Sequence, residues 1–170
     1  MTSPDWPNLL RTSNPGLSVE HEIGQAHAPD SLDGAVALRV HADGSLHLTL
    51  TRQDVVTEWT ARVHPGSAAK LFRRLADRGV PDLPLEPFGP GPSRRFLVLR
   101  CDGAEAICEL SRATTDRDPA WEPIIVWFDG AVERILGREL PEWLKRAPVV
   151  KDARRRQHDE DTDNPPMVGV

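Results

Sequence analysis

The stretch that decides the fold runs over residues 35–63, AVALRVHADGSLHLTLTRQDVVTEWTARV. On both sides of Asp43-Gly44, apolar and polar side chains alternate, which is typical of an antiparallel hairpin with one buried face. A two-residue loop would mix the two faces, whereas a three-residue loop that ends at Gly44 sets Val40 opposite Leu46. We therefore predict the longer loop, with the glycine in the left-handed conformation.

A third strand and a helix follow this hairpin. The strand is expected over about 55–63, and pairing Leu50 with Val55 gives it the same apolar face as the hairpin. A helix over about 65–78 can begin at its proline without losing a hydrogen bond, and it can end at Gly79. Its buried side is expected to consist of residues at helical spacing, namely Ala68, Leu71, Phe72 and Leu75.

A second hairpin, 95–110, turns at Asp102-Gly103. A two-residue turn aligns Arg100 with Glu105 on one face and places the small and aliphatic partners together on the other. A helix over about 119–136 follows, starting at either of two prolines. Its buried stripe is expected at Ile124, Ile125, Phe128, Val132 and Ile135.

The remaining segments are expected to be irregular. Prolines and glycines interrupt 1–30 too often for a long regular element, although the alternation over 17–23 predicts an edge strand. The prolines of 80–94 predict a stiff connection that crosses over without pairing. The charged tail, 148–170, lacks the apolar pattern needed to offset the entropy of ordering, so we expect it to be disordered.

Together these elements predict a single α+β domain over residues 31–147. Its antiparallel sheet is expected to have five to six strands, in the order β(β)ββ-α-ββ-α, with two main helices packed on one face. A chain of 170 residues with irregular ends is long enough for one ordinary core.

The composition is typical of a soluble protein. Hydrophobic residues make up 39% of the chain, and no apolar run approaches the roughly 20 residues that a membrane-spanning helix needs. The first residues lack the basic start and apolar run of a secretory signal, so we expect a cytoplasmic location. The net charge of -5 makes nucleic acid an unfavoured partner, because phosphates would not be attracted overall.

The cysteines and histidines do not form a recognisable reactive site. In the second hairpin Cys101 and Cys108 lie about 13 Å apart along the strand, too far for a disulfide. Both thiols are therefore expected to be small core residues. His41 and His47 share one outer face, with Glu58 one strand away, but the ligand spacings typical of zinc are missing. We expect neither a metal nor a cofactor.

Motifs for nucleophilic catalysis and phosphate binding are also missing from the sequence. No G-x-S-x-G pattern occurs, and the glycines of 88–92 alternate with prolines, which remove the backbone donors of a phosphate-binding loop. Arg94-Arg95 and the run 154–156 could contact phosphates or acidic partners, but short charge runs are more often solvated surface. We therefore expect a protein that is not an enzyme.

The strongest functional signal is apolar surface left over on the second hairpin. If the helices cover one face, then Phe96, Val98 and Ile107 lie on the other face with Arg100, which is typical of a partner-binding site. Trp127, off the main stripe of its helix, is a further candidate for partner contact, with partial burial beside Trp143 as the favoured alternative. The N-terminal segment could instead cover the patch through Trp6, Leu9 and Leu10.

One resemblance rests on the hairpin from Val36 to Leu50 and on the helix that opens with His64-Pro65-Gly66-Ser67 and ends by Gly79. These elements resemble small bacterial α+β domains, such as the emfourin-type protease inhibitors and several immunity proteins of toxin systems. The resemblance covers roughly residues 17–137 and consists of element order and hydrophobic spacing, so no functional residue carries over. It implies a non-enzymatic role in binding.

We therefore expect a protein-binding module, an immunity-like or accessory protein that masks or recruits a partner protein. One alternative is a small enzyme or ligand-binding protein with a pocket between the sheet and the 80–94 loop. Another is an assembly component whose two tails become ordered on a neighbouring protein. Affinity capture would return a protein in the first and third cases, and a ligand-dependent thermal shift would indicate the second.

Overall fold

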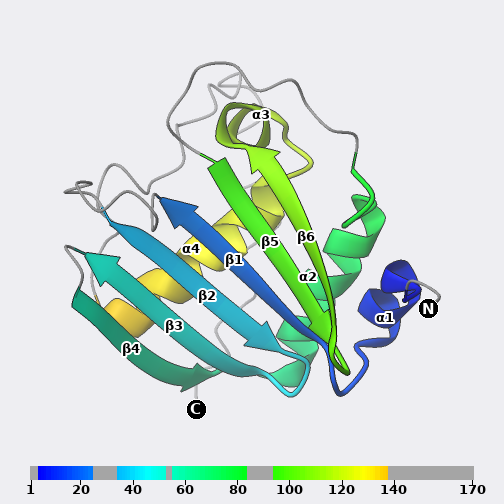
Figure 1. The fold of residues 1–170 in the computed structure, drawn as a ribbon, viewed down its shortest axis with the longest axis horizontal. Helices are drawn as coiled ribbons and strands as arrows, with labels where there is room; N and C mark the ends of the chain where they lie inside the picture. The colour runs from blue at the N-terminus through cyan, green and yellow to red at the C-terminus, as the bar shows by residue number, and fades with distance from the viewer. Residues whose placement is uncertain (1–3, 25–33, 53–54, 84–93, 138–170) are drawn as a thin grey trace, which may run out of the picture.

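The computed structural model describes residues 4–24, 34–52, 55–83 and 94–137. These residues form a six-stranded antiparallel sheet in the order β4-β3-β2-β1-β5-β6, with helices against one face (Figure 1). The strands are β1 Ser18–Gly24, β2 Ala35–His41, β3 Ser45–Arg52, β4 Val55–Arg62, β5 Arg94–Cys101 and β6 Ala104–Ser111. The helices are α1 Trp6–Thr12, α2 Pro65–Asp77, α3 Arg112–Arg117 and α4 Glu122–Leu136. The predicted α+β class is confirmed.

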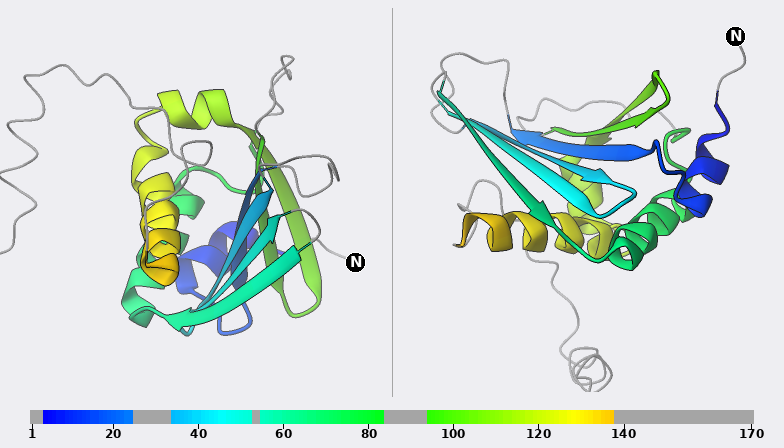
Figure 2. Two further views of the ribbon diagram at one scale, coloured as in Figure 1. Left: turned by 90° about the vertical axis from the view of Figure 1, so that its left-hand side faces the viewer. Right: turned by 90° about the horizontal axis from the view of Figure 1, so that it is seen from below.

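Seen along the sheet, the molecule has two layers (Figure 2). α2 and α4 lie against the same face, and α1 packs beside α2. The core fills the space between the layers, because one side of every strand points toward the helices; it includes Leu38, Leu48, Leu97, Phe72 and Phe128. We call this side of the sheet the inner face and the opposite side the outer face.

Both hairpins have the predicted register. Val40 pairs with Leu46 across the three-residue loop, and Gly44 has a φ of +84°. A side chain at this glycine would collide with the backbone carbonyl of Val63, so the turn also allows the next strand to approach closely. In the second hairpin Arg100 pairs with Glu105, as expected for a two-residue turn.

The predicted register of the third strand was wrong by two residues. Leu50 pairs with Thr57 and not with Val55, because β3 continues to Arg52 before the chain returns. A shift of two residues leaves every side chain on the same face, since strand side chains alternate with a period of two. The assignment of Trp59 and its alternate neighbours to the inner face is therefore confirmed.

The predicted edge position of the first strand is also wrong. β1 lies in the middle of the sheet, where it pairs with β2 on one side and β5 on the other. On the outer face, Glu20 of β1 contacts Arg39 of β2 and Arg100 of β5. Apolar alternation is the same in an edge strand and a central strand, so the sequence pattern did not indicate this position.

Residues 1–30 were expected to be irregular apart from one strand, but they also contain α1. The Asp5 carboxylate accepts a hydrogen bond from the backbone N–H of Asn8 at 3.2 Å and so caps the helix, and Pro7 lies in its first turn. Trp6 and Leu10, one turn apart, are buried in the core. α3 was not predicted either, and α4 begins at Glu122, nearer the second of the two candidate prolines.

Both main helices bury the residues that the spacing predicts. Ala68, Leu71, Phe72 and Leu75 are buried on α2, which ends before Gly79 with a φ of +80°. On α4 the stripe from Ile124 to Val132 is buried, and Ile135 is half-buried. The connection predicted over 80–94 is described only to Leu83, and the tail over 148–170 lies outside the described residues.

Candidate protein-binding surface

Three apolar side chains lie side by side on the outer face at the β5–β6 end of the sheet. Val98 of β5 pairs directly with Ile107 of β6, and Phe96 is two residues before Val98 on the same face. We call Phe96, Val98 and Ile107 the outer patch. The prediction that they share the face opposite the helices is confirmed, because Leu97, Leu99 and Cys108 point into the core.

Charged residues from four strands border the outer patch. Arg100 Nε donates a hydrogen bond to Glu105 Oε2 at 2.8 Å, and its Nη1 donates to Glu20 Oε1 at 3.3 Å. Arg39 Nη2 lies 2.8 Å from Glu20 Oε2. Each guanidinium is thereby held in place by a carboxylate, which gives the rim a fixed pattern of alternating charge. Sequence reasoning missed Glu20 and Arg39 because it placed β1 at the edge.

The members of the outer patch differ in exposure. Ile107 is 62% exposed, Phe96 is half-buried and Val98 is only 7% exposed. In the described part of the chain no helix covers this face (Figure 2). The alternative in which Trp6, Leu9 and Leu10 cover the patch is wrong, because α1 packs against α2 on the helical side.

Trp127 does not join the outer patch. It lies on α4, in the helical layer, where its indole N–H donates a hydrogen bond to Ser67 Oγ at 3.0 Å. Its ring packs edge-on against Phe128, with ring centroids 5.6 Å apart. Trp127 is half-buried and links α4 to α2, so the structure brings together only the four candidate residues on β5 and β6.

A buried polar cluster lies on the inner face of the sheet, at β1 and β5. Arg95 of β5 is fully buried, and its Nη2 donates a hydrogen bond to Asp116 Oδ1 of α3 at 2.9 Å. Its Nη1 lies 3.3 Å from His21 Nε2 of β1, and the imidazole stacks on the ring of Phe128. Because arginine only donates, Nε2 accepts and the ring proton of a neutral His21 is on Nδ1. Arg95, expected at the surface, is thus a core residue.

Acidification is expected to weaken the fold through His21. Burial, and secondly the charge of Arg95, hold the pKa of His21 well below its usual 6.5. Below about pH 6.5 the unfolded chain therefore binds a proton that the folded chain does not, which reduces stability by up to about 1.4 kcal/mol for each pH unit. Urea unfolding at several pH values should show this loss, which stops once pH falls below the pKa of folded His21.

The matched variant for this experiment is His21→Gln, which keeps an acceptor for Arg95 but does not titrate. It should lose less stability than the wild type as the pH falls from 7.5 to 5.5. Equal losses in the two proteins would show that another group is responsible.

The two thiols are unsuited to nucleophilic chemistry in this state. Cys101 and Cys108 are both free and buried. Burial raises the pKa of Cys108 to about 11, and burial together with the nearby Asp102 carboxylate raises that of Cys101. The prediction that both are unpaired core residues is confirmed.

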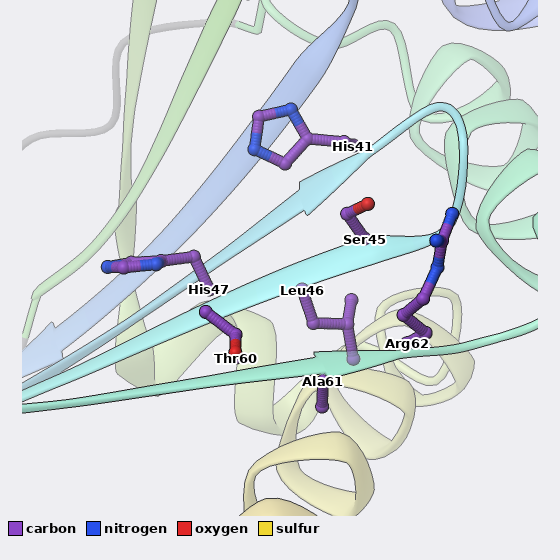
Figure 3. Close-up of a pocket in the computed structure, with 7 residues that line it drawn as sticks. All are labelled: His41, Ser45, Leu46, His47, Thr60, Ala61 and Arg62. Atoms are coloured by element: carbon purple, nitrogen blue, oxygen red, sulfur yellow. The ribbon is translucent and has the colours of Figure 1, made fainter.

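A shallow hollow of about 480 Å³ lies at the other end of the outer face (Figure 3). It is lined by His41, Ser45, Leu46, His47, Thr60, Ala61 and Arg62. His47 Nε2 lies 3.3 Å from Glu58 Oε1, which confirms that Glu58 is one strand away. Within the described ranges, no three His, Cys, Asp or Glu side chains are grouped so that they could hold a metal ion.

No family model matches the chain, and the search of curated proteins found no significant match. The resemblance to emfourin-type inhibitors and immunity proteins therefore stays a prediction. Among the described residues no helix has both the length and the apolar character to cross a membrane.

Proposed function

We propose that this protein binds another protein through the outer patch, as an immunity-like or accessory protein that masks or recruits its partner. The observation that carries the proposal is the apolar row from Phe96 to Ile107 on a sheet face that no described helix covers. An apolar centre with a polar rim is the usual anatomy of a protein interface. The partner surface would be apolar opposite Ile107 and charged opposite Arg100 and Glu105.

Two further features support a binding role over an enzymatic one. The rim arginines and carboxylates are already oriented by each other, so little side-chain entropy would be lost on association. The most reactive groups near this end of the sheet, Cys101, Cys108 and His21, are all buried. A pocket between the sheet and the 80–94 loop would involve residues outside the described part of the chain.

Changing Ile107 to aspartate is expected to abolish partner binding with little effect on the fold. A carboxylate at the most exposed position of the outer patch would have to be desolvated in the complex, which costs several kcal/mol. Capture of partners from the native host by tagged protein, followed by mass spectrometry, measures the effect. The melting temperature should change little because the side chain is largely in solvent.

The control is Val126→Asp, which makes the same kind of change at an exposed valine of α4, in the helical layer. Val98 is unsuitable for this test because its burial would mix loss of binding with loss of stability. A protein that the wild type and Val126→Asp capture, but Ile107→Asp does not, supports the proposal. A partner retained by all three proteins would show that the outer patch is not the binding surface.

A further inference from the structure

β4 is a regular edge strand with few of the features that usually prevent edge-to-edge pairing. It spans Val55–Arg62, it contains no proline or lysine, and β3 is its only neighbour in the described sheet (Figure 1). Val55 and Val56 are 63% and 58% exposed. A long edge strand with exposed apolar residues is a template for pairing with another strand.

The backbone of β4 also points half of its polar groups outward. The N–H of Val63 donates to the Gly44 carbonyl at 2.9 Å, immediately beyond the pair formed by Ser45 and Arg62. In an antiparallel ladder, a bond between the residues that flank a pair means that the pair itself exchanges no backbone hydrogen bonds. Ser45 and Arg62 are therefore a non-hydrogen-bonded pair. The N–H and C=O groups of Arg62, and by alternation those of Thr60, Glu58 and Val56, therefore point away from β3.

We propose that this edge pairs with β4 of a second copy of the chain, antiparallel, about a two-fold axis at Thr60. Thr60 then lies opposite its symmetry mate, and Glu58 of each copy lies opposite the partner's Arg62. The outward backbone groups of these residues form the new ladder, and the two sheets become one continuous sheet. Opposite charges directly across a pair of strands stabilise the pairing, and here the symmetry supplies two such pairs.

Symmetric registers with the axis at Glu58 or Trp59 lack this complementarity. For the two sheets to become one, the outer faces of both copies must lie on the same side of the joint sheet. Residues directly opposite each other must then be an even number of positions apart in the sequence, so the two-fold axis passes through a residue and not between two residues. An axis at Glu58 would set the two Glu58 carboxylates against each other, which is unfavourable. An axis at Trp59 would set Glu58 opposite Thr60 and Val56 opposite Arg62, with no charge pair.

The side chains that would form these pairs are accessible. Glu58 and Arg62 are both exposed, and their contacts within the chain are long: 3.3 Å from Glu58 to His47 and 3.5 Å from Arg62 to Asp43. Exposed pairs of this kind contribute little and leave the side chains available for a partner.

At the other edge of the sheet, formed by β6, like charges oppose symmetric pairing about Ile107. In β6 the two-residue turn directs the backbone groups of Glu105, Ile107 and Glu109 away from β5. Symmetric pairing at Ile107 would place Glu105 opposite the partner's Glu109, so like charges would face each other twice. The β6 register centred on Ile107 is therefore disfavoured, whereas pairing through β4 leaves the outer patch free.

Charge reversal across the proposed pair tests this inference. The wild-type chain should sediment as a concentration-dependent dimer at protein concentrations up to about 0.3 mM. Either Glu58→Arg or Arg62→Glu should raise the dimer dissociation constant about tenfold or more, because two like-charge contacts replace two attractive ones. The double variant, Glu58→Arg with Arg62→Glu, restores opposite charges and should restore the dimer.

Lys70→Glu on α2 provides the matched control, since it changes the net charge by the same amount as Arg62→Glu at an exposed site away from β4. Its dissociation constant should equal that of the wild type. A monomeric wild type, single reversals without effect, or a double variant that stays monomeric would each overturn the proposed pairing. None of these outcomes bears on the Ile107 experiment, because the outer patch lies at the opposite end of the sheet.

Discussion

Replacing Arg95 with methionine is expected to lower the free energy of unfolding by about 3–5 kcal/mol, because the buried Asp116 carboxylate would lose its guanidinium partner. Arg95 is fully buried, and Asp116 is nearly so, which leaves little water to replace the lost bond. Methionine fills much of the volume of the arginine stem, so the loss reports mainly on the charge. Urea unfolding monitored by tryptophan fluorescence measures the difference.

Arg100→Met is the control, because it makes the same change on the outer face of the same strand. Arg100 forms two partly exposed ion pairs, and their loss should cost less than about 1 kcal/mol. Adding Asp116→Leu to Arg95→Met should recover part of the stability, since removing both charges avoids burying a carboxylate without the guanidinium of Arg95. If Arg95→Met is no more destabilising than Arg100→Met, the cluster does not stabilise the fold in this way.

Trp6→Ala is the second change with a large expected effect. It should lower the free energy of unfolding by about 3–5 kcal/mol. Trp6 is almost fully buried, and together with Leu10 it attaches α1 to the core beside α2. Removing the indole would leave a cavity and weaken the docking of the whole helix. Thermal and urea unfolding should both show the loss.

Asn8→Ala tests whether that loss comes from the core contact or from the helix itself. Asn8 is exposed on the same short helix, so its replacement should change the free energy of unfolding by less than about 0.5 kcal/mol. Comparable effects of Trp6→Ala and Asn8→Ala would contradict the packing of α1 described here.

Features that depend on near neighbours in the chain could be predicted. The pairing of Val40 with Leu46 follows from alternation and from a glycine at the turn, and the same holds for Arg100 and Glu105. Because one face of each hairpin is apolar, the outer position of Val98 and Ile107 followed as well. The exposure of the individual residues could not be predicted, since Val98, which is only 7% exposed, lies between Glu20 of β1 and Ile107 of β6.

The sequence by itself therefore determined the two hairpins, the buried sides of α2 and α4, and the faces of β5 and β6, because each depends on a local period of 2 or 3.6 residues. Only the tertiary structure decided that β1 joins the hairpins, that Arg95 meets His21 and Asp116 in the core, and that Glu20 links Arg39 and Arg100 on the outer face. These arrangements bring together residues that are far apart in the chain. No local pattern encodes them, since alternation assigns a residue to a face but does not select the strand or helix that packs beside it.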